Sequence, residues 1–298
     1  MQQRGVLFLA MVLILTGCVS APPEDEPTMV SALSDSVQIT VGGVDRDFLI
    51  RAPAHRDDEA LPVLIGLHGA GDTPEAFESY TGFTDAIEAD RFIAVYPQGQ
   101  PIKDGRLVWN AGTCCGDVDG EFVDDITFLS DVIAAMPDYG GDSSRIYVVG
   151  YSNGGMMTYG VGCELGDQIA GIAVVSGALN VTQCPSTESM PVQIVHGTAD
   201  VVIPFDGGLA SAGASAGLRP WENASVWAGV QLWLERDGCS DDFDETYSGV
   251  VTTTSYTDCE NNSSLTVSVI DGGEHIWPSD PDNLDATALV LDSFITAG

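Results

Sequence analysis

Apolar residues along the chain occur in short continuous runs, each closed by glycine or another turn residue. Runs of this length are typical of strands buried on both faces, as in a parallel sheet with helices on each side. The runs cover residues 61–67, 92–96, 146–149 and 169–175, and the similar segments 192–195 and 265–270 are interrupted by Gln193, Thr266 and Ser268. The pattern therefore predicts a central, mostly parallel sheet.

Segments with helical spacing of apolar residues alternate with these runs. They lie at residues 124–135, 226–236 and 284–295, and Thr73-Pro74-Glu75 has the capping threonine and early proline of a further helix. Residues 37–41 and 47–51 predict an antiparallel hairpin ahead of the sheet. The alternation predicts an α/β fold with right-handed crossovers, in which chemistry lies at the carboxyl ends of the strands.

The first residues have the pattern of a targeting signal. Arg4 precedes an apolar stretch at residues 6–15, which is too short to span a bilayer, and Leu15-Thr16-Gly17-Cys18 follows. This ending is similar to the bacterial lipobox, in which cleavage precedes a cysteine that receives a lipid; an ordinary secretory signal is the alternative. We expect a signal peptide at 1–17, lipidation at Cys18, an acidic tether with prolines at 18–35 and a single domain at 36–298.

The net charge of −34 limits the partners that the chain can bind. Lys103 is the single lysine, and phosphate contacts need a basic surface, so nucleic acid binding is not expected. The charge favours a neutral substrate over an anionic one. It fits either a strongly solvated secreted surface or adaptation to high salt, where screening reduces self-repulsion.

Six cysteines remain beside Cys18, and an even number in an exported chain predicts disulfides. Proximity along the chain favours Cys163 with Cys184 and Cys239 with Cys259. Cys114 and Cys115 then either form a vicinal bridge or stay reduced. No C-x-x-C or paired histidine spacing accompanies them, so no metal site is expected.

The sequence Gly150-x-Ser152-x-Gly154 has the form of a nucleophile elbow. It follows the apolar run at 146–149 and precedes an apolar helical segment, which is the context that the motif requires. The strained turn leaves no room for side chains two residues on either side of the serine. Ser152 is therefore the predicted nucleophile.

A serine nucleophile needs a base, and the base needs an orienting acid. Of the four histidines, His55 lies in a charged loop, while His68 and His196 end buried strands and are expected to brace the loops that follow. His275 lies in the loop after the last strand, where a base in the order serine, acid, histidine belongs.

Asp200 follows the buried run at 192–195 and is the predicted acid, with Asp206 as the alternative. The developing oxyanion needs backbone donors, and we expect these from Asn153 and from Ala70, with Gly71 as the alternative to Ala70. Val123-Asp124-Asp125 is expected to brace a neighbouring loop or to cap the following helix.

Several motifs together resemble a known group of proteins. They are residues 67–71 (LHGAG), Trp109-Asn110 with Cys114-Cys115-Gly116, Val123-Asp124-Asp125, residues 150–156, residues 196–200 and residues 273–278. In this order they resemble the secreted polyhydroxybutyrate depolymerase and feruloyl esterase group, including its lipoprotein members, over roughly residues 36 to 295.

The resemblance implies an α/β-hydrolase fold and cofactor-free ester hydrolysis by a Ser152, His275 and Asp200 triad, and we expect no large cap domain on this fold. It implies hydroxyalkanoate esters or feruloyl and acetyl esters of polysaccharide as substrates. Trp109 and Trp277 are predicted to line the acyl or sugar pocket, with core packing as the alternative. We expect a monomer that contacts a membrane only through its lipid. A serine peptidase and a non-catalytic binding lipoprotein are the competing functions.

Overall fold

The computed structural model describes residues 33–54, 59–115, 117–118, 121–122, 124–210, 221–280 and 283–296. The expected signal peptide, Cys18, most of the expected tether and His55 lie outside the described residues. The first strand, β1, begins at Leu33, ahead of the domain boundary expected at residue 36. No helix in the described part of the chain is both long and apolar enough to cross a membrane.

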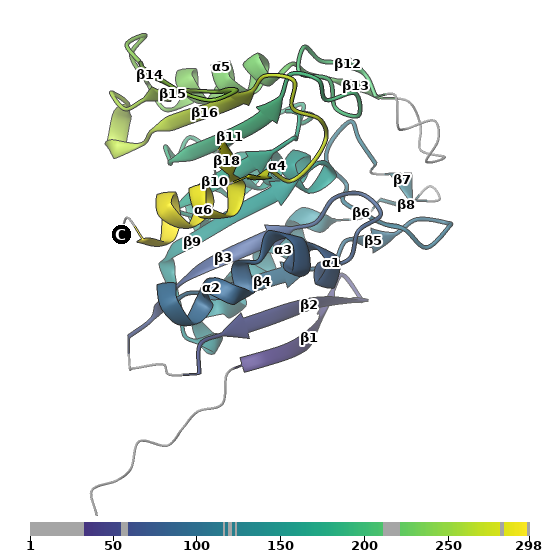
Figure 1. Ribbon diagram of the computed structural model, residues 1–298. Helices are drawn as coiled ribbons and strands as arrows, with labels where there is room; N and C mark the ends of the chain where they lie inside the picture. The colour runs from purple at the N-terminus through teal and green to yellow at the C-terminus, as the bar shows by residue number, and fades with distance from the viewer. Residues whose placement is uncertain are drawn as a thin grey trace, which may run out of the picture.

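A ten-stranded sheet forms the centre of the molecule (Figure 1). Its order is β1-β2-β4-β3-β9-β10-β11-β16-β15-β14, and the strands from β4 to β16 are parallel. These parallel strands are β4 (Ile93–Pro97), β3 (Leu61–Leu67), β9 (Gly141–Tyr151), β10 (Gly171–Val175), β11 (Val192–Gly197) and β16 (Leu265–Ile270). Every residue of β3, β4, β10 and β11 is buried, which confirms the interpretation of the apolar runs.

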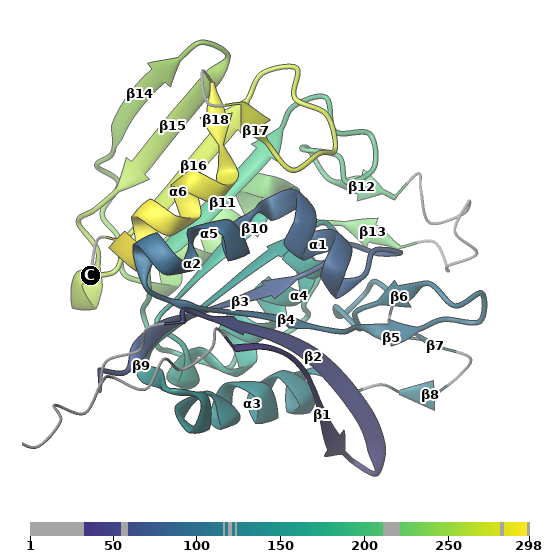
Figure 2. The same cartoon turned by 60° about the horizontal axis from the view of Figure 1, so that its bottom comes forward.

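Antiparallel strands complete both edges of the sheet. β1 (Leu33–Val41) and β2 (Val44–Ala52) form the predicted hairpin, and β2 pairs with β4. At the opposite edge, β14 (Asp244–Ser248) and β15 (Val251–Tyr256) form a second hairpin beside β16 (Figure 2). The apolar pattern does not predict this hairpin, because β14 is exposed along its whole length.

Helices cover both faces of the sheet (Figures 1 and 2). Side chains of α1 (Pro74–Thr81), α2 (Phe83–Asp90) and α6 (Ala286–Leu291) belong to the apolar cluster on one face. Side chains of α3 (Asp125–Ala135), α4 (Asn153–Glu164) and α5 (Val226–Arg236) belong to the cluster on the other face. Helix α1 has the predicted cap, because the Thr73 side chain accepts a hydrogen bond from the N–H of Ala76.

Short strand pairs occur in the connecting loops: β5 (Gln100–Pro101) with β6 (Leu107–Val108), β7 (Asp117–Val118) with β8 (Glu121–Phe122), β12 (Gly208–Leu209) with β13 (Glu222–Asn223), and β17 (Ser279–Asp280) with β18 (Leu284–Asp285). Three disulfides connect Cys163 with Cys184, Cys239 with Cys259, and Cys114 with Cys115. The first two confirm the predicted pairs, and the third decides the alternative left open for the adjacent cysteines.

Candidate active site

The turn between β9 and α4 holds Ser152 in a conformation that few residues adopt. Its backbone angles are φ 57° and ψ −122°, and its N–H donates to the carbonyl of Val175 at 2.9 Å. A Cβ atom on Gly150 would lie 2.2 Å from the carbonyl oxygen of Gly154, and one on Gly154 would lie 2.1 Å from that of Leu67. The two glycines are therefore required by close backbone approach, which lets the strained turn form.

Ser152, His275 and Asp200 form a continuous hydrogen-bonded chain. Ser152 Oγ lies 2.9 Å from His275 Nε2, and His275 Nδ1 lies 2.7 Å from Asp200 Oδ2. A carboxylate can only accept, so Nδ1 carries the proton and Nε2 is left to accept from the serine hydroxyl. The three side chains come from the loops after β9, β11 and β16, as the parallel topology predicts.

Asp200 is held in its charged form by several donors. Burial alone would raise its pKa, but hydrogen bonds from His196, His275 and the N–H of Ile203 lower the pKa well below the usual aspartate range. Its Oδ1 atom accepts from the N–H groups of Val202 and Ile203 at 2.9 and 2.8 Å. A charged, immobile carboxylate can stabilise the imidazolium that forms when His275 takes a proton.

His196 is fully buried beneath the same loop. Its Nε2 atom donates to the carbonyl of Ile203 at 2.9 Å and lies 3.4 Å from Asp200 Oδ2. It therefore braces the loop after β11, as predicted. The alternative acid, Asp206, is not bonded to His275; Asp200 occupies that position.

Two segments that line the cavity contain the residues expected to supply backbone donors, Ala70 and Asn153. Asn153 is the first residue of α4, where the N–H has no acceptor within the helix. In the loop after β3, Gly71 donates its N–H to the carbonyl of Leu107 at 2.8 Å, so that donor is already used. Ala70 and Asn153 both line the cavity above Ser152, so their placement favours Ala70 over Gly71 as the second donor.

A cavity of about 460 Å³ opens over Ser152 and His275. Its lining combines apolar side chains and the Cys114–Cys115 disulfide with one carboxylate and one guanidinium. The apolar side chains are Met156, Val202, Ile203 and Trp221, and the charged ones are Asp72 and Arg106. Arg106 is paired with Asp104, which leaves a lining of mixed character suited to a neutral ester.

The prediction that two tryptophans line the pocket is wrong, because neither is among the lining residues. Trp109 is fully buried, and its indole N–H donates to the carbonyl of His68 at 2.9 Å. Trp277 packs edge-on against Phe77 and Phe83, and its indole N–H donates to Thr287 Oγ1 at 3.1 Å. Both belong to the packed interior, which was the alternative interpretation.

Sequence reasoning missed several residues near the nucleophile, among them two tyrosines that bond to residues of the site. The Tyr151 hydroxyl donates to the carbonyl of His275 at 2.9 Å, and its ring lies 5.1 Å from the imidazole. The Tyr80 hydroxyl donates to Asp72 Oδ2 at 3.2 Å, and burial raises the pKa of Asp72. Position beside Ser152 is a signal that could have identified Tyr151. Trp221 and Asp72 carry no motif, since only the fold brings them to the cavity, and Tyr80 contacts that lining through its hydrogen bond to Asp72.

Asp124 and Asp125 perform the two structural roles expected of their motif. Asp124 caps α3 by accepting from the N–H of Thr127 at 2.9 Å. Asp125 is buried, accepts from Arg46 Nη2 at 2.7 Å, and accepts from the N–H of Asn110 at 2.7 Å. No cluster of three or more metal-binding side chains occurs among the residues that the structure describes.

Comparison with known proteins places this site in context. Residues 50–216 match the phospholipase/carboxylesterase family. The Nocardia uniformis subsp. tsuyamanensis protein NocK, named as an esterase, is 27% identical over 93% of this chain and 90% of its own length. Feruloyl esterase B of Piromyces equi is 26% identical over 77% of this chain, which spans 42% of that longer protein.

Among solved structures, the acetyl xylan esterase of Aspergillus awamori superposes with a TM-score of 0.64. The match covers 87% of this chain and 98% of that one at 15% identity, so it bears on the fold alone. These comparisons confirm the α/β-hydrolase fold and the esterase resemblance inferred from the motifs. The chain therefore belongs to the phospholipase/carboxylesterase family and is a carboxylic-ester hydrolase.

Proposed function

We propose that this protein is an exported serine esterase that works through a covalent acyl-enzyme. Ser152 is the nucleophile, His275 the general base and Asp200 the acid that orients and stabilises His275. The N–H groups of Asn153 and Ala70 are the proposed oxyanion donors. The observation that carries the proposal is the pair of hydrogen bonds from Ser152 to His275 and from His275 to Asp200, at the base of a cavity.

The proposed reaction moves one proton at each step. His275 Nε2 takes the proton of Ser152 Oγ as that oxygen bonds to the ester carbonyl carbon. The same proton passes to the alcohol oxygen as the ester bond breaks, which leaves the acyl group on Ser152. Water then enters, and its oxygen bonds to the acyl carbon as His275 Nε2 takes one of its protons. The bond between that carbon and Ser152 Oγ then breaks, the proton passes from His275 to Oγ, and the carboxylic acid leaves.

The proposed substrates are neutral carboxylic esters, either feruloyl or acetyl esters of polysaccharide or oligomers of hydroxyalkanoates. The name of the Piromyces relative supports the first class. The apolar lining by Met156, Ile203 and Trp221 suits an aromatic or alkyl acyl group. The carboxylate of Asp72 and the net charge of −34 both oppose an anionic ligand.

Export and lipid attachment at Cys18 are part of the proposal. Three disulfides support export, because such bonds persist in oxidising compartments. Expression of the whole chain in a bacterial host tests the anchor. The wild type should be found with the membrane, and Cys18→Ala should be found in the soluble extracytoplasmic fraction. Equal distribution of the two proteins would contradict the anchor.

Labelling by a fluorophosphonate probe tests the nucleophile. The wild type should be labelled, and Ser152→Ala should not be. Turnover divided by the Michaelis constant for methyl ferulate, acetylated xylan, a hydroxybutyrate trimer and short p-nitrophenyl esters then identifies the substrate class. A wild type that neither reacts with the probe nor cleaves any of these esters would refute the proposed function.

A further inference from the structure

Trp109 connects the two segments that carry the proposed oxyanion donors. Its indole N–H donates to the carbonyl of His68 at 2.9 Å. His68 lies two residues before Ala70, in the loop after β3 that lines the cavity. The Trp109 side chain is therefore hydrogen-bonded to the first donor segment, residues 68–71.

The backbone of Trp109 is hydrogen-bonded to Asn153, which begins the second donor segment at the start of α4. Its N–H donates to Asn153 Oδ1 at 2.7 Å, and its carbonyl accepts from Asn153 Nδ2 at 3.1 Å. The side-chain amide of Asn153 thus pairs with the peptide groups of Trp109 through two hydrogen bonds. Because the backbone N–H of Asn153 is the other proposed donor, Trp109 contacts both halves of the oxyanion site.

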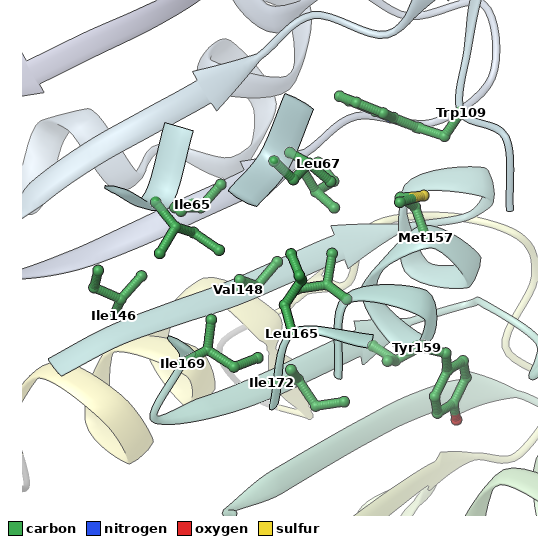
Figure 3. Close-up of a cluster of buried hydrophobic side chains, with 14 of the residues drawn as sticks. Ile65, Leu67, Trp109, Ile146, Val148, Met157, Tyr159, Leu165, Ile169 and Ile172 are labelled. Carbon is green, nitrogen blue, oxygen red and sulfur yellow. The ribbon is translucent and has the colours of Figure 1, made fainter. Parts of the chain in front are cut away.

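The surroundings leave these contacts little freedom. Trp109 and His68 are fully buried, and Asn153 is 2% exposed. The indole and imidazole rings lie 5.2 Å apart, and His68 Nε2 accepts from the N–H of Gly99 at 3.0 Å. Figure 3 shows Trp109 at the end of the apolar cluster, near Leu67 and Met157. Movement of Trp109 would therefore break buried hydrogen bonds and open the core.

We propose that Trp109 is a positioning residue that sets the spacing between the N–H groups of Ala70 and Asn153. The inference rests on the proposed acyl transfer. Oxyanion donors act when they lie 2.7–3.1 Å from the oxygen as charge develops, so a change in their spacing weakens transition-state binding more than substrate binding. Loss of one donor costs about 100- to 1000-fold in turnover, and displacement of a donor costs less.

Trp109→Phe is the test, because it removes the indole N–H and keeps an aromatic ring. We expect kcat per active site to fall about 10- to 100-fold with KM changed by less than about threefold. Binding of a trifluoromethyl ketone, which forms a tetrahedral oxyanion adduct with Ser152, should weaken by the same factor as kcat/KM. Active sites are counted with the fluorophosphonate probe, so that misfolded protein does not enter the rate.

Trp233→Phe is the matched control. Trp233 is also fully buried, on α5, and lies outside the cavity lining. The control should lose stability but keep kcat, KM and affinity for the ketone. Asn153→Ala is the second variant, because it keeps the backbone N–H and removes the contact with Trp109. It should reproduce the selective loss of kcat, and it decides the question if Trp109→Phe does not fold.

Three results would overturn the inference: kcat within about threefold of the wild type, an equal loss in the control, or a raised KM with unchanged kcat. The last result would mean that Trp109 contributes to substrate binding only. An inactive, unlabelled wild type would instead refute the proposed function. The two failures are therefore distinguishable.

Discussion

Removal of the Asp125 carboxylate should destabilise this protein far more than removal of its neighbour. Asp125→Ala would leave the Arg46 guanidinium, only 4% exposed, without the oxygen that now lies 2.7 Å away. It would also leave the N–H of Asn110 without its acceptor. Asp124→Ala is the matched control, because Asp124 is exposed and its carboxylate caps α3 without a hydrogen bond to Arg46.

The expected magnitudes follow from this burial. An uncompensated buried charge costs about 3–5 kcal/mol, whereas loss of a helix cap costs about 1 kcal/mol. Arg46→Met combined with Asp125→Ala removes both charges, so the pair should cost about 2 kcal/mol less than the sum of the single substitutions. The Arg46 guanidinium also lies 3.9 Å from the centre of the Phe128 ring, so a methionine can keep part of that contact.

Urea unfolding followed by tryptophan fluorescence measures these differences. Molar salt should be present, since it screens repulsion among the acidic surface groups. The slope of free energy against urea should stay constant, which shows that the same surface is exposed in each variant. Equal losses in Asp124→Ala and Asp125→Ala, or additive losses for Arg46 and Asp125, would refute the reasoning.

Three further predictions concern the site, the interior and the disulfides. Asp200→Asn should lower kcat on the order of 10⁴-fold, because an amide cannot stabilise the imidazolium; a rise in KM alone would contradict this. Burial raises the pKa of Asp237 to about 6. Between about pH 6 and pH 4, Asp237 is therefore protonated in the folded protein and ionised in the unfolded chain, so the folded state is stabilised as the pH falls. The difference in unfolding free energy between the wild type and Asp237→Asn, measured in urea, should shift by about 1 kcal/mol in favour of the wild type from pH 7 to pH 5. A difference that stays constant with pH would refute the raised pKa of Asp237. Serine at both Cys163 and Cys184, 21 residues apart, should cost about 3 kcal/mol in the same assay, and a loss below about 1 kcal/mol would contradict a stabilising bridge.

Much of the fold could be predicted because local pattern and burial agree in the parallel strands. A strand buried on both faces is mostly apolar, so β3, β4, β10 and β11 are visible in the sequence, although β11 also buries Gln193 and His196. The β14–β15 hairpin has no such requirement, because β14 is exposed on both faces. Helix α2 was missed for another reason: it follows α1 directly at Gly82, whose left-handed conformation ends one helix and precedes the next.

Tertiary structure was needed wherever one residue type suits two environments. An aromatic residue beside a polar motif has the same sequence signature whether it lines a cavity or packs in the core, so only the fold placed Trp109 and Trp277 in the interior. The sequence does not distinguish Gly71 from Ala70 as an oxyanion donor. The structure does, because the N–H of Gly71 already donates to the carbonyl of Leu107. Asp72 and Trp221 come from distant segments and meet only at the cavity.

The sequence alone determined the nucleophile elbow at Ser152 and the order in which serine, acid and histidine follow parallel strands. It could do so because a strained strand–turn–helix connection excludes side chains at Gly150 and Gly154, a local requirement that leaves a local pattern. Only the tertiary structure decided the distances among Ser152, Asp200 and His275 and the link made by Trp109. Those depend on packing between segments far apart in the chain, which no local pattern records.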